Sequence, residues 1–373
     1  MKILFTGGGT GGHLFPLIAI IRELKEIDSL NLEMSFIGPE DDFSKELFKN
    51  EGIYVKRIMT GKIRRQAGLL DYFQNILDMA IRVPIGIIQS FYYIFFLSPD
   101  LIFSKGGHGS VPAIIAGKLL QVPIFLHESD VAPGLANKKI NKFALEIFSS
   151  FPKTEYFPPE KLIFVGNPIR KELLEPPTEG ELKRNLSIKS DKPIIFIIGG
   201  SQGSERINDL IMQILPQLLD KFEIIHQCGL NNFENIQLQA EFLVSKSMRE
   251  HYHLFGFMNE SQLKSAYIMA DIVVSRSGSG SIFEIASFGK PSILIPIPES
   301  AQNHQAKNAY AYSDYGAGLV MEEDNLTPHF FLQKLIGLIN SPKSMESMKE
   351  KAKEFSKPRS ARIIAEYIVE FLR

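Results

Sequence analysis

Cysteine is almost absent from this chain of 373 residues, since Cys228 is the only one. A single thiol excludes internal disulfides and metal sites built from several cysteines, and it suits a reducing cytoplasm. An excess of charge of one sign is missing as well, because 41 Lys and Arg stand against 42 Asp and Glu. No global field therefore draws the chain to nucleic acid, and an anionic partner must be held by a local set of donors.

Long apolar runs are also scarce. The N-terminal run Met1–Thr6 is much shorter than the apolar region of a signal peptide, and we expect it to form a strand. The longest uncharged apolar stretch, Val83–Ser98, is shorter than the ~20 residues that a spanning helix requires. The sequence therefore predicts no helix that crosses a bilayer, but a segment that can contact one.

What the chain does contain is ordinary for a folded protein, with 45% hydrophobic and 22% charged residues. Short apolar runs alternate with helical or loop segments, a pattern typical of a parallel, doubly wound α/β sheet. These predicted strands lie at residues 3–5, 34–37, 101–103, 122–125, 143–148, 162–165, 193–198, 222–225, 253–257, 272–274 and 292–297.

The two halves of the chain open alike, each with a buried strand that runs into a glycine-rich loop. We therefore predict two Rossmann-like domains that face each other across a cleft. The first covers residues 1–165 and is completed by a C-terminal helix at 357–373, and the second covers residues 166–356. The alternative is that the C-terminal helix closes the second domain.

Glycine-rich loops occur at four places, which we call the first to fourth glycine loops: residues 7–12, 106–110, 199–203 and 277–281. Glycine lets backbone N–H groups approach an anion, and a helix N-terminus adds partial positive charge. Each loop alone could be a tight turn without a ligand. Together they favour a donor nucleotide on one domain and a second phosphorylated substrate on the other.

Two other nucleotide-binding classes fit less well. The first loop matches the spacing of the dinucleotide fingerprint, and Glu40 could be the acidic residue that binds the ribose hydroxyls. A dehydrogenase, however, needs only one such loop. No loop is followed by the lysine of a P-loop, which disfavours hydrolysis of nucleoside triphosphates.

Several motifs, in this order and spacing, resemble the MurG family of bacterial N-acetylglucosaminyltransferases over nearly the whole chain. They are Gly8–His13 with Pro16, Gly106–Ser110 with Pro112, His127–Glu128 before Pro133–Lys138, Gly166–Arg170, Gly199–Gly203, Ser275–Gly278 through Glu284, and Asn303–Ala309. The resemblance implies a GT-B fold, no cofactor, and transfer from UDP-N-acetylglucosamine with inversion. The implied acceptor is lipid I, undecaprenyl-diphospho-N-acetylmuramoyl pentapeptide, which becomes lipid II for peptidoglycan at the cytoplasmic face of the inner membrane.

The family's donor contacts fall on Thr10, Gly11, Gly12, Arg170, Ser201, Met258, Ser279, Gly280, Ser281, Ile282, Phe283, Glu284 and Gln305. Arg170 and Ser201 would neutralise the leaving diphosphate, a task that another transferase fold gives to a metal held by paired aspartates. No Asp-x-Asp pair is present, and no bound metal is expected. Glu284 offers two acceptor oxygens to a ribose, and Met258 offers backbone groups to uracil. The alternative for Glu284 is a helix-capping acid after Ser281.

One position departs from a common family form. The pair after His127–Glu128 often reads Gln-Asn, whereas this chain has Ser129–Asp130. An ionised carboxylate accepts hydrogen bonds but cannot donate them. A contact from Asp130 to the sugar donor would therefore have to accept from a hydroxyl group.

Inversion requires a general base that takes the proton of the acceptor hydroxyl. His13 is the preferred candidate because of its intrinsic pKa, and Glu128 is the second. His13 could instead bind a diphosphate or form a structural hydrogen bond. Gly107, His108 and Ser110 are expected to bind the acceptor diphosphate.

A cation-flanked apolar segment suits a surface that dips into an anionic leaflet. Its members are Lys62, Arg64, Arg65 and Arg82 with Phe73, Ile76, Ile81, Ile85, Ile87, Ile88, Phe91, Tyr92, Tyr93, Phe95 and Phe96. The alternative is a helix buried against the sheet. Two other functions stay open for the whole chain, a GT-B transferase with another lipid or small-molecule acceptor and a non-catalytic dinucleotide-binding protein.

Overall fold

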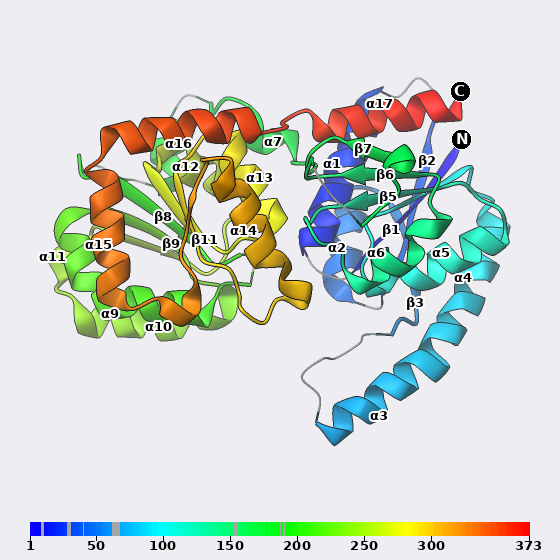
Figure 1. Ribbon diagram of the computed structural model, residues 1–373, viewed down its shortest axis with the longest axis horizontal. Helices are drawn as coiled ribbons and strands as arrows, with labels where there is room; N and C mark the ends of the chain where they lie inside the picture. Colours follow the sequence, from blue (N-terminus) through cyan, green and yellow to red (C-terminus); the bar gives the residue numbers. More distant parts are fainter. Residues whose placement is uncertain are drawn as a thin grey trace. The chain divides into compact units, whose positions relative to one another are not determined.

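The computed structural model describes residues 1–8, 11–27, 31–39, 41–61, 68–152, 156–178, 180–186, 188, 191–200 and 202–373. The chain forms two compact units (Figure 1). Unit 1 consists of residues 1–170 and 359–373, and unit 2 of residues 171–358. Each unit has its own parallel sheet, which confirms the prediction of two doubly wound α/β domains.

Within the described residues, the sheet of unit 1 has seven strands in the order β3-β2-β1-β4-β5-β6-β7, and all neighbours are parallel. Their bounds are β1 Lys2–Thr6, β2 Glu33–Pro39, β3 Tyr54–Ile58, β4 Leu101–Ser104, β5 Ile124–Glu128, β6 Glu146–Ser149 and β7 Leu162–Phe164. The strand order reverses between β1 and β4. In sheets of this kind, ligands bind outside the carboxyl ends of the strands at such a switch point.

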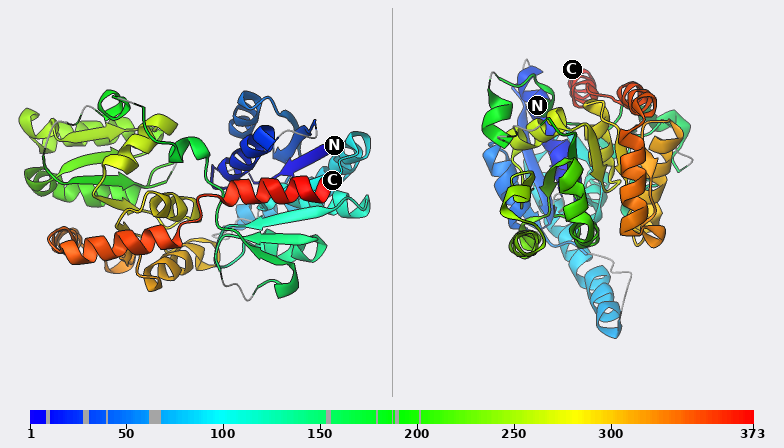
Figure 2. Two further views of the ribbon diagram at one scale, coloured as in Figure 1. Left: turned by 90° about the horizontal axis from the view of Figure 1, so that it is seen from above. Right: turned by 90° about the vertical axis from the view of Figure 1, so that its left-hand side faces the viewer.

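Helices cover both faces of this sheet because successive strand residues point to opposite sides. Ile3 and Phe5 of β1 join the core under α1 (Gly11–Ile27), α2 (Asp42–Asn50) and α17 (Ser360–Leu372). Leu4 joins the core under α4 (Val83–Leu97), α5 (Val111–Leu119) and α6 (Leu135–Ile140). The C-terminal helix α17, red in Figure 2, packs beside α1 in unit 1.

In the described part of unit 2, six parallel strands have the order β10-β9-β8-β11-β12-β13. Their bounds are β8 Ile194–Ile198, β9 Glu223–Gln227, β10 Tyr252–Phe255, β11 Ile272–Ser275, β12 Ser292–Leu294 and β13 Leu319–Val320. The order reverses between β8 and β11, so unit 2 has the same kind of switch point as unit 1.

One face of the second sheet packs against α9 (Glu205–Lys221), α10 (Phe233–Leu243) and α15 (Pro328–Ile339). On the other side, Phe196 of β8 meets the ring of Tyr267 at 5.2 Å between centroids. That side carries α12 (Glu260–Met269), α13 (Ser279–Ser287), α14 (His304–Asp314) and α16 (Pro342–Phe355). The shorter elements are α7 Lys171–Leu174, α8 Glu181–Leu186, α11 Lys246–Arg249, η2 His108–Ser110, η3 Asn141–Phe143, η4 Pro159–Lys161, η5 Leu230–Asn232, η6 Ala301–Asn303 and η7 Glu323–Asn325.

One helix of unit 1 is longer than the sequence predicted. The helix α3 (Leu69–Leu77) runs through a π-helical turn, η1 (Asp78–Arg82), directly into α4. By length and composition alone, the 27 residues Asp71–Leu97 are enough to cross a membrane, although the uncharged part of this helix is still limited to α4. The charge of Arg82 is paired one turn away with Asp78 at 3.0 Å inside the same helix.

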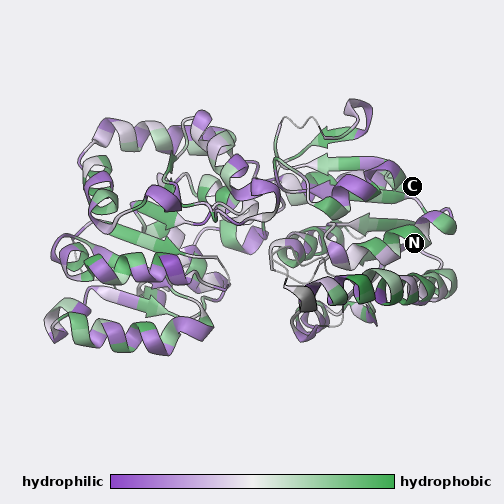
Figure 3. Cartoon of the chain, turned by 60° about the horizontal axis from the view of Figure 1, so that its bottom comes forward, coloured by the Kyte–Doolittle hydropathy of each residue, from purple (hydrophilic) through white to green (hydrophobic). Residues whose placement is uncertain are grey.

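This long helix has an exposed apolar surface and a narrow buried stripe. In Figure 1, α3 extends away from the sheet, and most of the helix is coloured as hydrophobic in Figure 3. Its buried stripe, Gly86, Ser90 and Ile94, holds α4 against α5. A Cβ on Gly86 would lie 1.9 Å from the carbonyl oxygen of Met59, so glycine is required there. The exposed apolar side chains are Tyr72, Phe73, Ile76, Leu77, Met79, Ile81, Ile85, Ile88, Phe91, Tyr92, Phe95 and Phe96.

Candidate functional site

The four glycine loops begin at the carboxyl ends of the central strands. The first and second loops follow β1 and β4 in unit 1, and the third and fourth follow β8 and β11 in unit 2. The strands of each pair are hydrogen-bonded neighbours, with Thr6 opposite Ser104 and Ile198 opposite Ser275. Each unit therefore brings two glycine loops together at its switch point.

In unit 1 the two loops touch, and they do so because they lack side chains. Gly106 and Gly107 both have φ of +80°, a left-handed conformation that favours glycine. A Cβ on Gly106 would lie 1.9 Å from Asn137 Oδ1, and one on Gly109 would lie 2.6 Å from the carbonyl oxygen of Gly7. A larger residue at Gly109 would force the two loops apart, and one at Gly106 would displace Asn137 of α6.

His13 lies in the first turn of α1, half-buried, with its ring between the two loops. A Cβ on Gly107 would lie 3.2 Å from His13 Nε2, and one on Gly8 would lie 3.4 Å from Nδ1. Gly11 is buried and Gly12 is exposed. The imidazole is thus placed to contact a ligand of either loop, whereas Thr10 lies outside the described residues.

The residues predicted to bind the acceptor diphosphate differ in burial and in hydrogen bonding. Ser110 is fully buried, and its hydroxyl donates to the carbonyl oxygen of Gly107 at 2.9 Å. This hydroxyl therefore holds the turn of the second loop. His108 is half-buried at the start of η2.

A carboxylate lies buried at the end of β5. Glu128 is 4% exposed, and its Oε1 accepts from the backbone N–H of Asp130 at 3.0 Å while Oε2 accepts from Asn137 Nδ2 at 2.7 Å. Burial, followed by the nearby Asp130 charge, raises the pKa of Glu128 to about 7, although Lys105 opposes the rise. The group therefore titrates near neutral pH, where a proton acceptor is most useful.

Two further polar residues of unit 1 have distinct roles. His127 is fully buried, with Nε2 3.2 Å from the carbonyl oxygen of Gly166, and burial followed by the charge of Lys105 holds its pKa well below the usual value. This histidine is neutral and structural. Arg170 is 8% exposed, and its guanidinium lies 4.2 Å from the centre of the Phe15 ring, which fixes its orientation.

In unit 2, the predicted run from Ser279 to Glu284 forms the first turns of α13. Ile282 and Phe283 are 0% and 1% exposed, so their side chains belong to the core and only their backbone could meet a ligand. Gly280 and Ser281 are half-buried and more open. The first N–H groups of the helix have no partner within it and suit an anion.

Glu284 is half-buried and is oriented by a neighbouring helix. The hydroxyl of Tyr267 on α12 donates to Glu284 Oε2 at 3.1 Å, and Tyr267 itself is fully buried and stacked on Phe288. A helix-capping acid would stand in the first turn of α13, whereas Glu284 lies beyond that turn. The arrangement holds a carboxylate in place for hydrogen-bond donors.

Gln305 joins two of the loops of unit 2. Its Oε1 accepts from the N–H of Ile297 at 3.1 Å, and its backbone oxygen accepts from the hydroxyl of Ser277 at 2.8 Å. Met258 is 3% exposed in the loop after β10, so its backbone rather than its side chain is suited to a ligand. Ser201 lies outside the described residues.

The sequence showed no role for Arg276, Lys105 or Tyr267. Arg276 is 4% exposed and donates to Ser204 at 2.8 Å, to the carbonyl oxygen of Ile295 and to Glu323. It therefore ties the loops after β8, β11 and β12 to one another. For Arg276 and Lys105, the sequence did contain an indication of a role, because each is a cation that directly follows a buried strand. Tyr267 gave no signal, because its contact depends on how α12 packs against α13.

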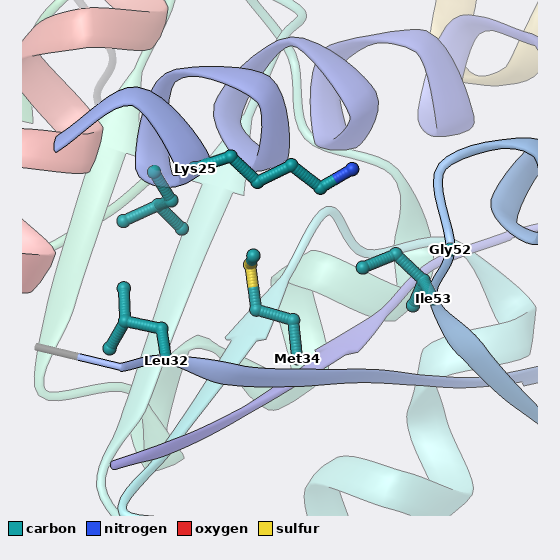
Figure 4. A pocket seen from close by; sticks show the side chains of 6 residues that line it. Lys25, Leu32, Met34, Gly52 and Ile53 are labelled. Carbon is teal, nitrogen blue, oxygen red and sulfur yellow. The ribbon is translucent and has the colours of Figure 1, made fainter. Parts of the chain in front are cut away.

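A hollow in unit 1 lies away from the glycine loops. The hollow in Figure 4 has a volume of about 230 Å³ and is lined by Leu24, Lys25, Leu32, Met34, Gly52 and Ile53. It lies at the amino ends of the strands of unit 1, away from the glycine loops. In the part of the chain that the structure describes, no group of three or more His, Cys, Asp or Glu residues could hold a metal ion.

Comparison with known proteins identifies relatives over most of the chain. The family model described as Glycosyltransferase family 28 N-terminal domain matches residues 3–149, and the Glycosyltransferase family 28 C-terminal domain matches residues 194–364. A protein of Bacillus cereus named UDP-N-acetylglucosamine–N-acetylmuramyl-(pentapeptide) pyrophosphoryl-undecaprenol N-acetylglucosamine transferase 2 is 39% identical, and the match covers 87% of this chain and 88% of the relative.

Two further similarities agree with these matches. A transferase of the same name, without the final number, from Clostridium tetani is 38% identical over 93% of each chain. Among solved structures, that of Acinetobacter baumannii MurG superposes with a TM-score of 0.74 at 22% identity and covers 99% of both chains. At that identity the structural likeness shows the fold, which is that of a GT-B glycosyltransferase.

Proposed function

Because the chain belongs to glycosyltransferase family 28, we propose that it transfers N-acetylglucosamine from UDP-N-acetylglucosamine to lipid I, which gives lipid II for peptidoglycan synthesis. The observation that carries the proposal is the pair of glycine loops at the switch point of each sheet. A transferase with two phosphorylated substrates needs two such places. Relatives at 38–39% identity are named for this reaction.

The nucleotide belongs to unit 2 in this proposal. The N-terminus of α13 faces the diphosphate, Glu284 accepts from the ribose hydroxyls, and the backbone at Met258 meets the uracil edge. The orientation of Glu284 by Tyr267 supports this assignment, since a preorganised acceptor loses less entropy on binding. Unit 1 then takes the acceptor, with His13, Gly107 and His108 at its diphosphate.

Ribose recognition is tested by Glu284→Ala and Tyr267→Phe. Losing the carboxylate leaves the ribose hydroxyls without an acceptor, at a cost of about 1–3 kcal/mol, so UDP should bind roughly 5- to 150-fold more weakly. Tyr267→Phe should have a smaller effect of the same sign. Isothermal titration calorimetry measures both.

The control is 2′,3′-dideoxy-UDP, to which all three proteins should bind alike. Glu346→Ala, an exposed glutamate of unit 2, should bind UDP as the unmodified chain does. Unchanged UDP affinity in Glu284→Ala would remove this residue from the site.

In this proposal the leaving diphosphate is neutralised without a bound metal, by Ser201 and by backbone N–H groups of unit 2. Arg170 of unit 1 suits a phosphate group because a guanidinium binds phosphate oxygens through two parallel hydrogen bonds, and its stacking on Phe15 limits its motion.

Transfer itself is measured with radiolabelled UDP-N-acetylglucosamine and a lipid I analogue, beside UDP-glucose and simple lipid acceptors. We expect label in lipid II that persists in excess EDTA. Abolition by EDTA with rescue by a divalent cation would contradict the metal-free mechanism. Transfer to another acceptor alone would favour a different GT-B activity, and UDP binding without any turnover would favour a binding protein.

The general base in this proposal is Glu128, with His13 at the acceptor diphosphate. Sequence alone preferred His13, but two features of the site favour Glu128. Its pKa of about 7 suits proton abstraction near neutral pH, whereas the His13 ring lies against the backbone of both loops. Each carboxylate oxygen accepts one hydrogen bond within the protein and retains a second lone pair for the hydroxyl.

Turnover should therefore rise as the pH increases through about 7, because only the ionised Glu128 accepts a proton. Glu128→Gln should lower kcat by ~10²–10⁴-fold, with donor affinity nearly intact. His13→Ala should mainly raise the KM for the acceptor. If Glu128→Gln keeps normal turnover while His13→Ala loses it and the pH dependence, then His13 is the base.

Unit 1 associates peripherally with the cytoplasmic face of the membrane through α3, η1 and α4. The exposed apolar side chains of this helix would be costly in water and are favourable in a lipid interface. The buried stripe of α4 packs on α5, which holds that part of the helix on the unit and favours lying on the bilayer over crossing it. Of the expected cations, Lys62, Arg64 and Arg65 lie outside the described residues, and Arg82 is half-exposed.

Vesicle sedimentation tests this surface. Phe73→Ser and Phe96→Ser should each weaken binding to anionic vesicles roughly tenfold or more, since burial of a Phe side chain contributes about 1.5–3 kcal/mol. Phe242→Ser, at a 92% exposed position on α10 of unit 2, is the matched control and should have no effect. Replacing Lys62, Arg64 and Arg65 by Gln should lower binding to anionic vesicles but not to neutral ones. Equal losses in Phe242→Ser and Phe96→Ser would contradict the assignment.

A further inference from the structure

A lysine is buried in unit 1. Lys105 follows β4 directly and is 1% exposed, and its Nζ has no hydrogen-bond partner among the residues that the structure describes. An ammonium group that leaves water without an acceptor costs several kcal/mol. Such a cost is tolerable in a folded protein when opposite charge lies close enough to offset it.

The offsetting charge comes from the end of the neighbouring strand. β5 pairs with β4 and ends at Glu128, and Asp130 follows two residues later. These two carboxylates are the groups that favour the charged form of Lys105, against burial that lowers its pKa to about 8. The charge of Asp130 also disfavours ionisation of Glu128, and a cation beside them offsets this repulsion.

Asn137 also connects the loop that begins at Lys105 with the Glu128 carboxylate. The carboxamide of Asn137 lies directly against Gly106 and donates to Glu128 Oε2 at 2.7 Å. The second carboxylate oxygen is held by the backbone N–H of Asp130 at 3.0 Å. Contacts through Asn137 and the Asp130 backbone therefore link the Glu128 carboxylate to the chain beside Lys105.

We propose that Lys105 is a positioning residue whose buried charge balances the Glu128 and Asp130 carboxylates, so that Glu128 can lose its proton in the acceptor site. The inference rests on the proposed function, because it concerns the group that takes the acceptor proton. It adds a residue to which neither the sequence nor the relatives' names assign a role.

Charge counting makes the inference specific. With Lys105 and Asp130 both ionised, the group with Glu128 has a single net negative charge. Removal of Lys105 alone makes the group doubly negative, and neutralisation of Asp130 alone makes it neutral. Removal of both restores the single negative charge, and a residue that acts only by packing would not behave in this way.

The titratable surroundings of Glu128 set the sign of the effect. They are Lys105 after β4, Asp130 after β5, and neutral His127 on β5, while Asn137 of α6 donates a hydrogen bond. Lys105 lowers the pKa of Glu128 and Asp130 raises it. Loss of Lys105 should therefore move the rate profile to higher pH, and loss of the Asp130 charge should move it to lower pH.

The test compares the unmodified chain with Lys105→Met, Asp130→Asn and the double variant. Methionine keeps the length of the side chain and suits a buried position. In transfer to the lipid I analogue, we expect the midpoint of kcat against pH to rise by about one unit in Lys105→Met and to fall in Asp130→Asn. The double variant should return close to the unmodified profile. Lys118→Met, an exposed lysine on α5, is the control.

A second measurement does not depend on activity. With ¹³C-labelled glutamate, NMR titration of the Glu128 carboxyl carbon should show the same order of pKa values, and thermal melts report folding. If Lys105→Met is unfolded, Lys105→Gln and Asp130→Asn provide the same comparison. Unmoved Glu128 titration in these variants, or a double variant no better than Lys105→Met, would overturn the inference. Absence of transfer by the unmodified chain would refute the proposed function, while the NMR titration still decides the role of Lys105.

Discussion

Parallel pairing of β1 with β4, and of β8 with β11, is the constraint on which the remaining features depend. Neighbouring parallel strands end at the same edge of a sheet, so the loops that follow them start side by side. The strand order reverses at these two pairs, which leaves the space outside their ends uncovered by a crossover helix. Glycines in the loops then bring backbone N–H groups close to any ligand, as the contact between the first two loops of unit 1 illustrates.

Around each pair of loops, buried charged groups hold the geometry. In unit 2, Arg276 joins three loops through its hydrogen bonds, and Tyr267 donates a hydrogen bond to the Glu284 carboxylate. In unit 1, Asn137 and the Asp130 backbone hold Glu128, and Lys105 offsets its charge. Such supporting residues cost desolvation energy and are retained where they fix a site. The chemistry proposed for each unit follows from the group that its supporting residues hold in place. In unit 2 this group is a hydrogen-bond acceptor for ribose, and in unit 1 it is a titrating carboxylate.

Much of this arrangement could be predicted from the sequence, because buried parallel strands are continuous apolar runs and glycine clusters mark their ends. The strands that escaped prediction were β3 and β13. β3 has two successive charged residues, Lys56 and Arg57, at a half-exposed edge, and β13 has only two residues. The continuous helical segment that joins α3, η1 and α4 was not predicted, because charged residues interrupt its apolar pattern. Site residues within motifs were found, whereas Lys105 and Tyr267 were missed, since their roles arise from contacts between elements far apart in the sequence.

The central claim is that the carboxyl ends of β8 and β11 hold the donor nucleotide in unit 2. Amide hydrogen exchange of the full chain, measured with and without saturating UDP, tests this claim most directly. Exchange should slow at residues 256–258 and at residues 277–284, where backbone N–H groups are expected to bind the ligand. Protection that is absent from residues 277–284 and appears only at residues 105–110 would contradict the account.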